Sequence, residues 1–327
     1  MKLKKSTIFI SLLLIVLIIF LIIAPEISIS ACLSGIEVWA TNILPALFPF
    51  LLFTKLLGEL GFITYISDFI SPITEKLYNT SGISGYVYLM SIFSGYPVGA
   101  KITSDLVENK IIDSGQASRI TTFTSTSGPL FVLGTVAIGM FNNKTLGYVV
   151  LLSHFVGALL NGLLYRKYKY TPPQNTKVTI LTEQQKNILE DSMLSSIKSI
   201  MIVGGYISIF FMLITILNSF NIYTPILYIT SKVLHIDPQI ITSIINGIIE
   251  LTRGCLDVQA CHLSVKTSAM ILSGLISFGG LSINLQAYTF LKKANINMKF
   301  YLLQKITHSL LSIALAFIFG LIILWFV

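Results

Sequence analysis

Two short stretches interrupt what would otherwise be long apolar helices, and both carry small or polar residues. Residues 125–129 read Ser-Thr-Ser-Gly-Pro, and residues 278–282 read Phe-Gly-Gly-Leu-Ser. A helix break frees backbone N–H and C=O groups, which lipid cannot satisfy, so a break is tolerated only where it lines a polar cavity or is buried in protein. We expect both breaks to border a polar site. A kink that lets helices pack closely is the alternative for each.

The first break carries groups that could bind a polar ligand. Ser127 is predicted to cap the half-helix that follows, and Pro129 suits its first turn. The start of that half-helix presents free N–H groups and the positive end of its dipole. The hydroxyl groups of Ser125 and Thr126 lie beside it. The stretch therefore predicts a site for a small polar solute.

A second group of polar residues lies further along the chain. Residues 250–254 read Glu-Leu-Thr-Arg-Gly, and an ionisable residue at membrane depth indicates a functional site. Glu250 and Arg253 are three residues apart, so an internal ion pair is the alternative. The second break is followed by Ser282, Asn284 and Gln286; this spacing prevents all three from sharing one helical face. We expect Glu250 to face the interior, close to the Ser127–Gly128–Pro129 break.

The sequence gives no sign of enzymatic chemistry. It has no Walker loop, no H-E-x-x-H and no G-x-S-x-G motif. Its three cysteines, Cys32, Cys255 and Cys261, lack metal-ligand spacing, and we expect no metal and no cofactor. His154 and His308 are interpreted as packed helix residues, and Asp105, Glu108 and Lys110 as a solvated face. The candidate substrate-binding residues are Ser94, Gly95, Ser125, Thr126, Ser127, Gly128, Pro129, Glu250, Thr252, Gly279, Gly280, Ser282, Asn284 and Gln286.

Composition places the chain in a membrane. Of 327 residues, 54% are hydrophobic and only 11% are charged, which excludes an ordinary soluble domain. Apolar segments long enough to span occur at 6–24, 40–60, 146–166, 195–218, 267–290 and 302–327. The net charge of +8 comes from basic residues in loops and at segment ends, which indicates membrane topology and not nucleic-acid binding. We expect a multi-pass plasma-membrane protein surrounded by lipid.

The N-terminus is interpreted as a retained signal-anchor helix with a cytoplasmic start. Three lysines precede an apolar run at 7–24 that is longer than the apolar region of a signal peptide. A lipoprotein cleavage site at 29–32 is the alternative, but Pro25 and Glu26 separate it from the apolar run.

Residues 84–112 are too polar for a clean span and predict a re-entrant hairpin of two short helices that meet at a Gly/Pro tip. With this hairpin on the cytoplasmic side, the basic residues at 166–186 and 292–299 fall inside, as the positive-inside rule requires. A span at 84–100 would put the cluster at Arg166 outside. Asp113 and Gln116 predict the start of the broken helix 115–141.

The two halves of the chain show the same order of span, hairpin, broken span and span. Paired landmarks lie about 150 residues apart: Gly99 and Gly254, Gly128 and Gly280, His154 and His308. Inverted repeats with broken segments at matching positions are typical of transporters. We predict an all-α polytopic fold with a signal-anchor helix at 1–30, a first repeat at 31–166, a cytoplasmic linker at 167–192 and a second, inverted repeat at 193–327.

Four motifs carry a resemblance to a known family. Residues 93–101, 127–129, 250–254 and 278–282 together resemble the sporulation integral membrane protein YlbJ family, which has the nucleoside-recognition or gate domain. The resemblance covers nearly all of the chain outside the first helix and the linker. It implies a fold like that of concentrative nucleoside transporters and a source in a sporulating Gram-positive bacterium. The family pattern has two asparagines where this chain has Ser125 and Thr126, and a histidine at Asn284.

Two functions are compatible with these features. The first is a secondary transporter or permease for a small polar solute, with a nucleoside-like molecule as the leading candidate. The second is a non-transporting membrane scaffold for assembly of the spore envelope or cortex. The sequence leaves open a homo-oligomer or a complex with other sporulation membrane proteins. The four motif stretches should converge around a polar cavity if the chain transports; stretches that stay apart, or the lack of a polar cavity between them, would favour the scaffold.

Overall fold

A computed structural model describes residues 5–170 and 187–323, and every regular element within these ranges is a helix. The first half of the chain contains α1 (Lys5–Ile23), α2 (Pro25–Val38), η1 (Trp39–Ile43), α3 (Leu44–Glu59), α4 (Phe62–Tyr78), α5 (Ile83–Ser94), α6 (Val98–Glu108), α7 (Ser114–Thr124), η2 (Phe131–Met140) and α8 (Lys144–Leu164). The second half contains α9 (Ile188–Ser219), α10 (Thr224–Leu234), α11 (Pro238–Ile249), α12 (Leu251–Ala260), α13 (Val265–Phe278), α14 (Gly280–Lys293) and α15 (Met298–Ile323). The predicted all-helical class is confirmed.

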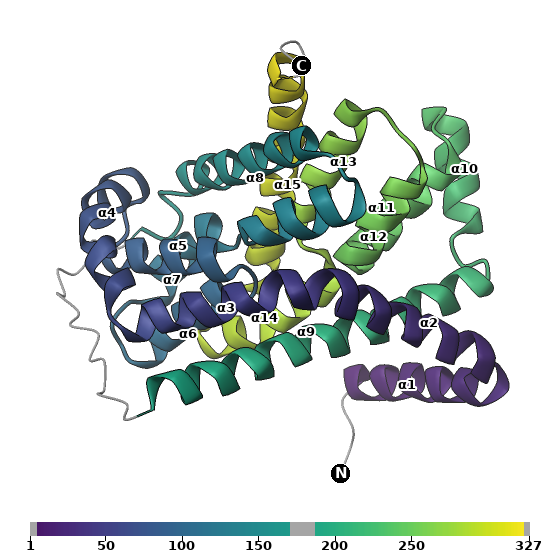
Figure 1. The fold of residues 1–327 in the computed structure, drawn as a ribbon, viewed down its shortest axis with the longest axis horizontal. Helices are drawn as coiled ribbons and strands as arrows, with labels where there is room; N and C mark the ends of the chain where they lie inside the picture. The colour runs from purple at the N-terminus through teal and green to yellow at the C-terminus, as the bar shows by residue number, and fades with distance from the viewer. Residues whose placement is uncertain (1–4, 171–186, 324–327) are drawn as a thin grey trace.

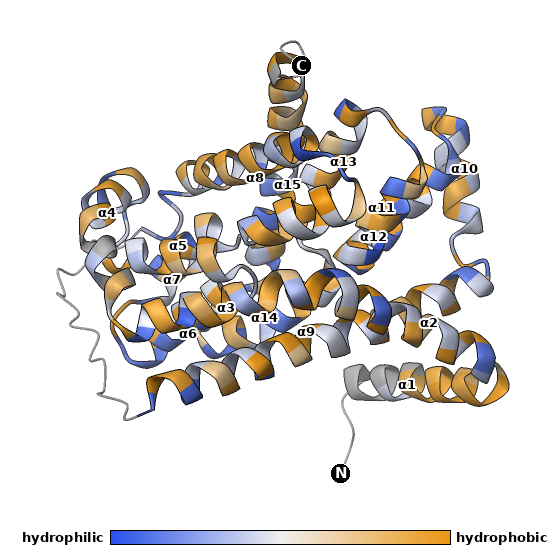
Figure 2. Cartoon of the chain, viewed as in Figure 1, coloured by the Kyte–Doolittle hydropathy of each residue, from blue (hydrophilic) through white to orange (hydrophobic). Residues whose placement is uncertain are grey.

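Five stretches of the described residues are long and apolar enough to cross a membrane. They are 25–59, 144–164, 188–219, 265–293 and 298–322. Many large hydrophobic side chains on these helices and on α1 are exposed, as expected of surfaces that face lipid. Figure 2 shows the resulting apolar colouring along α1, α8 and the end of α15. The chain is therefore a helical membrane protein.

The first hairpin and the first break have the local structure that the sequence predicts. Helices α5 and α6 are short and are joined by Gly95–Pro97. The side chain of Asp113 accepts a hydrogen bond from the backbone N–H of Gln116 at the start of α7, 2.8 Å away. Residues 125–128 then leave the helix, and helical structure resumes at Pro129 and continues as the π-helical η2. Asp105 and Glu108 of α6 and Lys110 just after it are exposed, which is compatible with the predicted solvated face.

The second half repeats this succession of elements. A long helix (α9), a short helix (α10), a pair of short helices (α11 and α12), a broken pair (α13 and α14) and a final long helix (α15) follow in order. Their counterparts in the first half are α3, α4, α5 with α6, α7 with η2, and α8. Glu250 separates α11 from α12, and Gly279 separates α13 from α14. The boundaries suggested at residues 30 and 192 fall inside α2 and α9.

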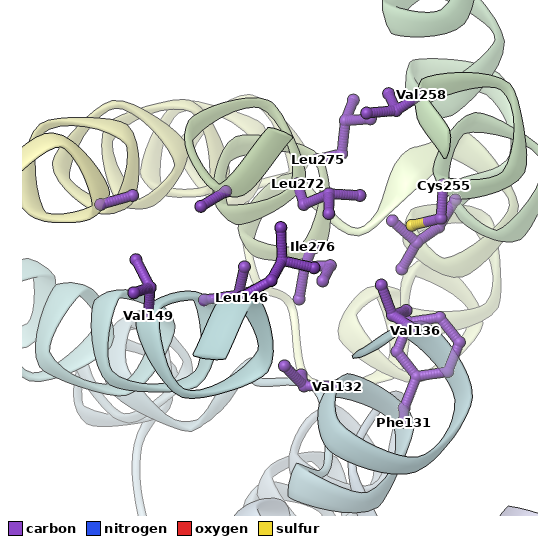
Figure 3. Close-up of a cluster of buried hydrophobic side chains, with 14 residues drawn as sticks. Phe131, Val132, Val136, Leu146, Val149, Cys255, Val258, Leu272, Leu275 and Ile276 are labelled. Carbon is purple, nitrogen blue, oxygen red and sulfur yellow. The ribbon is translucent and has the colours of Figure 1, made fainter. Parts of the chain in front are cut away.

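The largest apolar core joins the two halves. It unites Phe131, Val132 and Val136 of η2 and Leu146 and Val149 of α8 with side chains of the second half. Figure 3 shows these side chains pointing toward Leu272, Leu275 and Ile276 of α13 and toward Cys255 and Val258 of α12. Each broken helix is thus packed against elements of the other half of the chain.

The long helices of the two halves lie side by side along one flank of the molecule (Figure 1). Small residues let α2 approach α9 closely: a Cβ added at Gly35 would lie 2.8 Å from the Cα of Ser208. The indole of Trp39 lies over Gly204 and donates a hydrogen bond from Nε1 to the carbonyl oxygen of Ile200, at 3.1 Å. Close approach at small residues is a principal source of helix association in lipid.

Candidate functional site

The tip of the first hairpin lies against the first break. Gly95 has φ +67° and ψ −162°, a conformation that is essentially restricted to glycine. A Cβ added to it would lie 2.8 Å from the backbone nitrogen of Gly128. Gly99, the second residue of α6, packs against the carbonyl of Thr124 at the end of α7. The sequence therefore places glycine where two irregular backbones meet.

The tip of the second hairpin lies against the second break in the same way. Gly279 and Gly280 both have positive φ, at +86° and +71°. A Cβ on Gly280 would lie 3.1 Å from the backbone nitrogen of Leu251 and 3.2 Å from the carbonyl oxygen of Gly247. The second break therefore touches the backbone on both sides of Glu250.

Tyr96 connects the first hairpin to the second break. Its hydroxyl lies 3.3 Å from the carbonyl oxygens of both Ile276 and Ser277, to which it can donate. Its ring lies beside Gly279, where an added Cβ would be 3.6 Å from Cζ. The two tips and the two breaks thus form a chain of contacts.

A buried lysine lies at the junction of these contacts. Lys305 of α15 is 1% exposed, and its ammonium group donates to the hydroxyl of Tyr96 at 2.5 Å and to the carbonyl oxygen of Ser125 at 3.0 Å. The same ammonium lies 4.4 Å from the centroid of the Tyr96 ring. Neither ion pair found among the described residues includes Lys305. Among the described residues, the amino group therefore contacts a hydroxyl, a carbonyl oxygen and a π face and no carboxylate.

His154 of α8 links the two breaks directly. Its Nε2 accepts a hydrogen bond from the backbone N–H of Ser127 at 2.9 Å. Its Nδ1 lies 2.8 Å from Oγ of Ser277, which in turn donates to Oγ of Ser312 at 2.8 Å. An imidazole nitrogen that accepts from an N–H carries no proton, so the neutral ring has its proton on Nδ1 and donates to Ser277. His308 packs at 5.0 Å between ring centroids, and its Nε2 bonds to the carbonyl oxygen of His154.

Glu250 is buried, as predicted, but its neighbours differ from those expected. It is 2% exposed, and its carboxylate accepts a hydrogen bond from the backbone N–H of Arg253 at 2.7 Å, which caps α12. The guanidinium of Arg253 pairs instead with Asp257, at 2.9 Å from Nε to the carboxylate. The ion pair suggested between Glu250 and Arg253 is therefore wrong, because Asp257 lies one turn further along the same helix face.

One further expectation is corrected. Ser127 does not cap the half-helix, since the carbonyl oxygen of Gly128 accepts the first helical hydrogen bonds, from Phe131 and Val132. The backbone on both sides of Glu250 contacts the second break at Gly280. The closeness of Glu250 to the first break stays a prediction; the neighbouring Leu251 shares the large apolar core with Phe131.

The remaining candidate residues differ in their burial. Ser282 and Asn284 are buried, whereas Gln286 and Ser94 are partly exposed. The three residues that follow the second break thus differ in burial, which agrees with a spacing that keeps them off one common helical face. Thr126 Oγ1 and Asn284 Oδ1 are buried and have no hydrogen-bond partner among the described residues. The candidates that lie within the breaks and tips are Gly95, Ser125, Thr126, Ser127, Gly128, Pro129, Glu250, Thr252, Gly279 and Gly280.

Sequence reasoning missed Lys305 and Ser277 and underrated His154. The available signal was a lysine inside the apolar run 302–327, one turn before His308. An ionisable group in such a run indicates function by itself. Tyr96 lies within the motif at 93–101, but its role depends on contacts with residues about 180 positions away along the sequence.

The central side chains of the site are buried in this structure. Two hollows among the described residues lie elsewhere, one at 187–193 and one between η1, α3 and α9, and neither is the polar cavity that was expected between the four motif stretches. Within the described ranges, no group of three or more His, Cys, Asp or Glu side chains could hold a metal ion. The residues at the two breaks that could bind a ligand are the buried amino group of Lys305, the half-helix start and several hydroxyl groups.

Comparison with known proteins gives one match. The chain is 29% identical over 299 residues to the sporulation integral membrane protein YlbJ of Bacillus subtilis (strain 168), and the match covers 84% of this chain and 73% of that protein. No model of a protein family matches the chain, and no solved structure matches it. The match agrees with the resemblance carried by the four motifs.

Proposed function

The chain belongs to the family of the sporulation integral membrane protein YlbJ, and from this premise we propose that it transports a small anionic solute across a membrane of the sporulating cell. The observation that carries the proposal is the buried Lys305, which joins the first hairpin tip to the first break. The proposal includes no enzymatic role. It places the protein in the plasma membrane with its N-terminus in the cytoplasm.

The packing of the two halves supports transport. Helix α6 of the first hairpin contacts α14, and α12 of the second hairpin contacts η2. Likewise α8 contacts α13, and α15 contacts α7. Each half therefore presents equivalent elements to the other, as an inverted repeat would. In transporters of this kind, broken helices meet near the membrane midplane and form the solute site.

The charge at the junction favours an anion over the neutral nucleoside that the sequence suggested. A buried ammonium without a carboxylate carries a large desolvation cost, which hydrogen bonds to neutral groups offset only in part. A carboxylate or phosphate placed beside Lys305 would supply the negative charge that balances its ammonium group. It would also lie near the start of the half-helix at Pro129, where partial positive charge accumulates.

Reconstituted protein tests this function. Purified full-length chain in lipid vesicles would be supplied with labelled uridine, uridine monophosphate or succinate. We expect saturable uptake of at least one of the two anions and none of uridine. Lys305→Gln should lower that uptake at least about 100-fold, whereas Lys292→Gln, which removes an exposed lysine of α14, should leave it unchanged.

Three results would contradict the proposed transport of an anion. Saturable uptake of uridine that is unaffected by Lys305→Gln would exclude the anion site and favour a neutral nucleoside. The absence of saturable uptake for all three probes would count against transport. If Lys305→Gln also supported normal sporulation in a strain that depends on this gene, the scaffold function would replace the proposal.

A further inference from the structure

We propose that His154 accepts a proton and that its protonation breaks the hydrogen-bonded link between the two helix breaks. Solute movement would thereby be coupled to the movement of protons. The inference rests on the proposed function, because it names the ion that drives it. Its structural basis is the ring of His154, which is fully buried between the backbone of the first break and the side chain of Ser277 just before the second.

The closed arrangement uses both nitrogens of a neutral imidazole. Nε2 accepts from the N–H of Ser127, and Nδ1–H donates to Ser277. A proton on Nε2 would point one N–H at another and remove the hydrogen bond to Ser127. Two buried donors would then be unpaired, and each unpaired donor destabilises the closed arrangement. The protonated ring is therefore incompatible with the closed link between α8 and the first break.

The surroundings of the ring reinforce this incompatibility. The titratable groups that face it are His308 and Lys305, both on α15 and both cationic when protonated. Helix α7 carries Arg119, whose guanidinium binds carbonyl groups at residues 79, 168 and 169. Helix α13 carries Lys266, eleven residues or about 16 Å along the helix from Ser277. Within the part of the chain that the structure describes, none of the charged groups that act on His154 is a carboxylate.

Protonation would therefore open the first break and prepare it for an anion. When His154 gains a proton from the water on the side to which the site opens, the N–H of Ser127 becomes free for a ligand. The imidazolium and Lys305 then attract the same negative charge. By linkage, an anion that prefers this state must also favour proton uptake by the same factor. Closure around the site and opening to the other side would release both the anion and the proton there.

Amide hydrogen exchange tests the proposed protonation of His154 without any solute. Full-length protein in lipid nanodiscs would be exchanged at pH values from 5 to 8, and protection of the fragment 122–131 would be corrected for intrinsic exchange. If opening takes up one proton, its equilibrium constant should rise about tenfold for each pH unit of acidification in the range where the open state binds the proton. Wild-type protection that does not change with pH after correction would overturn the proposal.

Three variants distinguish a His154 that controls opening by gaining a proton from a His154 that only links the two breaks structurally. His154→Gln keeps an oxygen that can accept from Ser127 but cannot titrate, so the pH slope should vanish while the protein stays folded. His308→Gln is the matched control and should keep the slope. Ser277→Ala removes the partner of Nδ1 without removing the titrating ring, so it should weaken protection at every pH and retain the slope. A slope that persists in His154→Gln would refute the assignment.

A flux measurement separates this inference from the proposed function. Vesicles containing a trapped pH dye would be given uridine monophosphate or succinate with and without a pH gradient of about one unit. Anion uptake that carries protons in the wild type but not in His154→Gln supports the coupling. A pH slope in exchange without uptake of either probe would keep His154 as the proton acceptor and reject the transporter. Uptake without a slope or accompanying protons would keep the transporter and reject this inference.

Discussion

The contact between the first hairpin tip and the first break can be tested by adding one methyl group. Gly95→Ala would place a Cβ 2.8 Å from the backbone nitrogen of Gly128, closer than real Cβ contacts allow. The backbone conformation of Gly95 adds about 1–3 kcal/mol of strain for any other residue. Because the obstacle is backbone, no rotamer change relieves it. We expect a total destabilisation of about 3–5 kcal/mol, in the upper range for single substitutions.

Gly61→Ala is the matched control. Gly61 also has a positive φ, at +75°, but no atom lies within 4 Å of the Cβ that alanine would add. Its cost should be only that of the left-handed conformation, about 1–2 kcal/mol. The difference between the two variants therefore isolates the contact with Gly128 and should be about 2–3 kcal/mol, given the ranges for strain and clash together.

Thermal unfolding in lipid nanodiscs would measure this difference. For a chain of this size, about 1 kcal/mol corresponds to roughly 2 °C in Tm. Gly95→Ala should therefore melt about 4–6 °C below Gly61→Ala, a difference that follows from the same conversion. It should also lose exchange protection at 122–131 as well as in the hairpin. Equal melting temperatures, or unchanged protection at the break, would refute the packing of tip against break.

Three more substitutions test the site and its supports. Lys305→Met removes a buried charge together with its two hydrogen bonds, so Tm should change by less than about 5 °C while anion uptake is lost; retained uptake would contradict the anion site. Glu250→Gln keeps an oxygen for the N–H of Arg253, so the protein should insert and fold normally but fail to support sporulation, and full complementation would argue against a role for this carboxylate. Asp113→Ala removes the cap of α7 and should cost about 1 kcal/mol, measurable as a small drop in Tm without loss of uptake; an unchanged Tm would show that the cap is dispensable.

The local features of the fold could be predicted because local chemistry determines them. Glycine, proline and serine at 125–129 and 278–282 indicated helix breaks, and breaks occur there. Asp113 with Gln116 indicated a helix start and forms one. The Gly/Pro content of 95–97 indicated a hairpin tip, which joins α5 to α6. In each case the residues that indicate the feature lie within a few positions of the feature itself.

The site itself depended on contacts that sequence spacing does not encode. Lys305 meets Ser125 across 180 positions of the chain, and His154 meets Ser277 across 123. The periodicity of an apolar helix indicates which face is buried but not which other helix covers it. Arg253 likewise has two carboxylates nearby, those of Glu250 and Asp257. It pairs with Asp257 because of the direction in which the side chains point, which sequence spacing alone does not give.

The close seam between α2 and α9 has a consequence for how the molecule could move. With the backbone at Gly35 against Ser208 and the Trp39 indole seated on Gly204, neither helix can slide or rotate past the other without a steric clash. We therefore expect α2 and α9 to move together as a fixed frame during any conformational change. The hairpins and broken helices, which contact one another through an apolar core, glycines and single hydrogen bonds, are then the parts that would move against this frame.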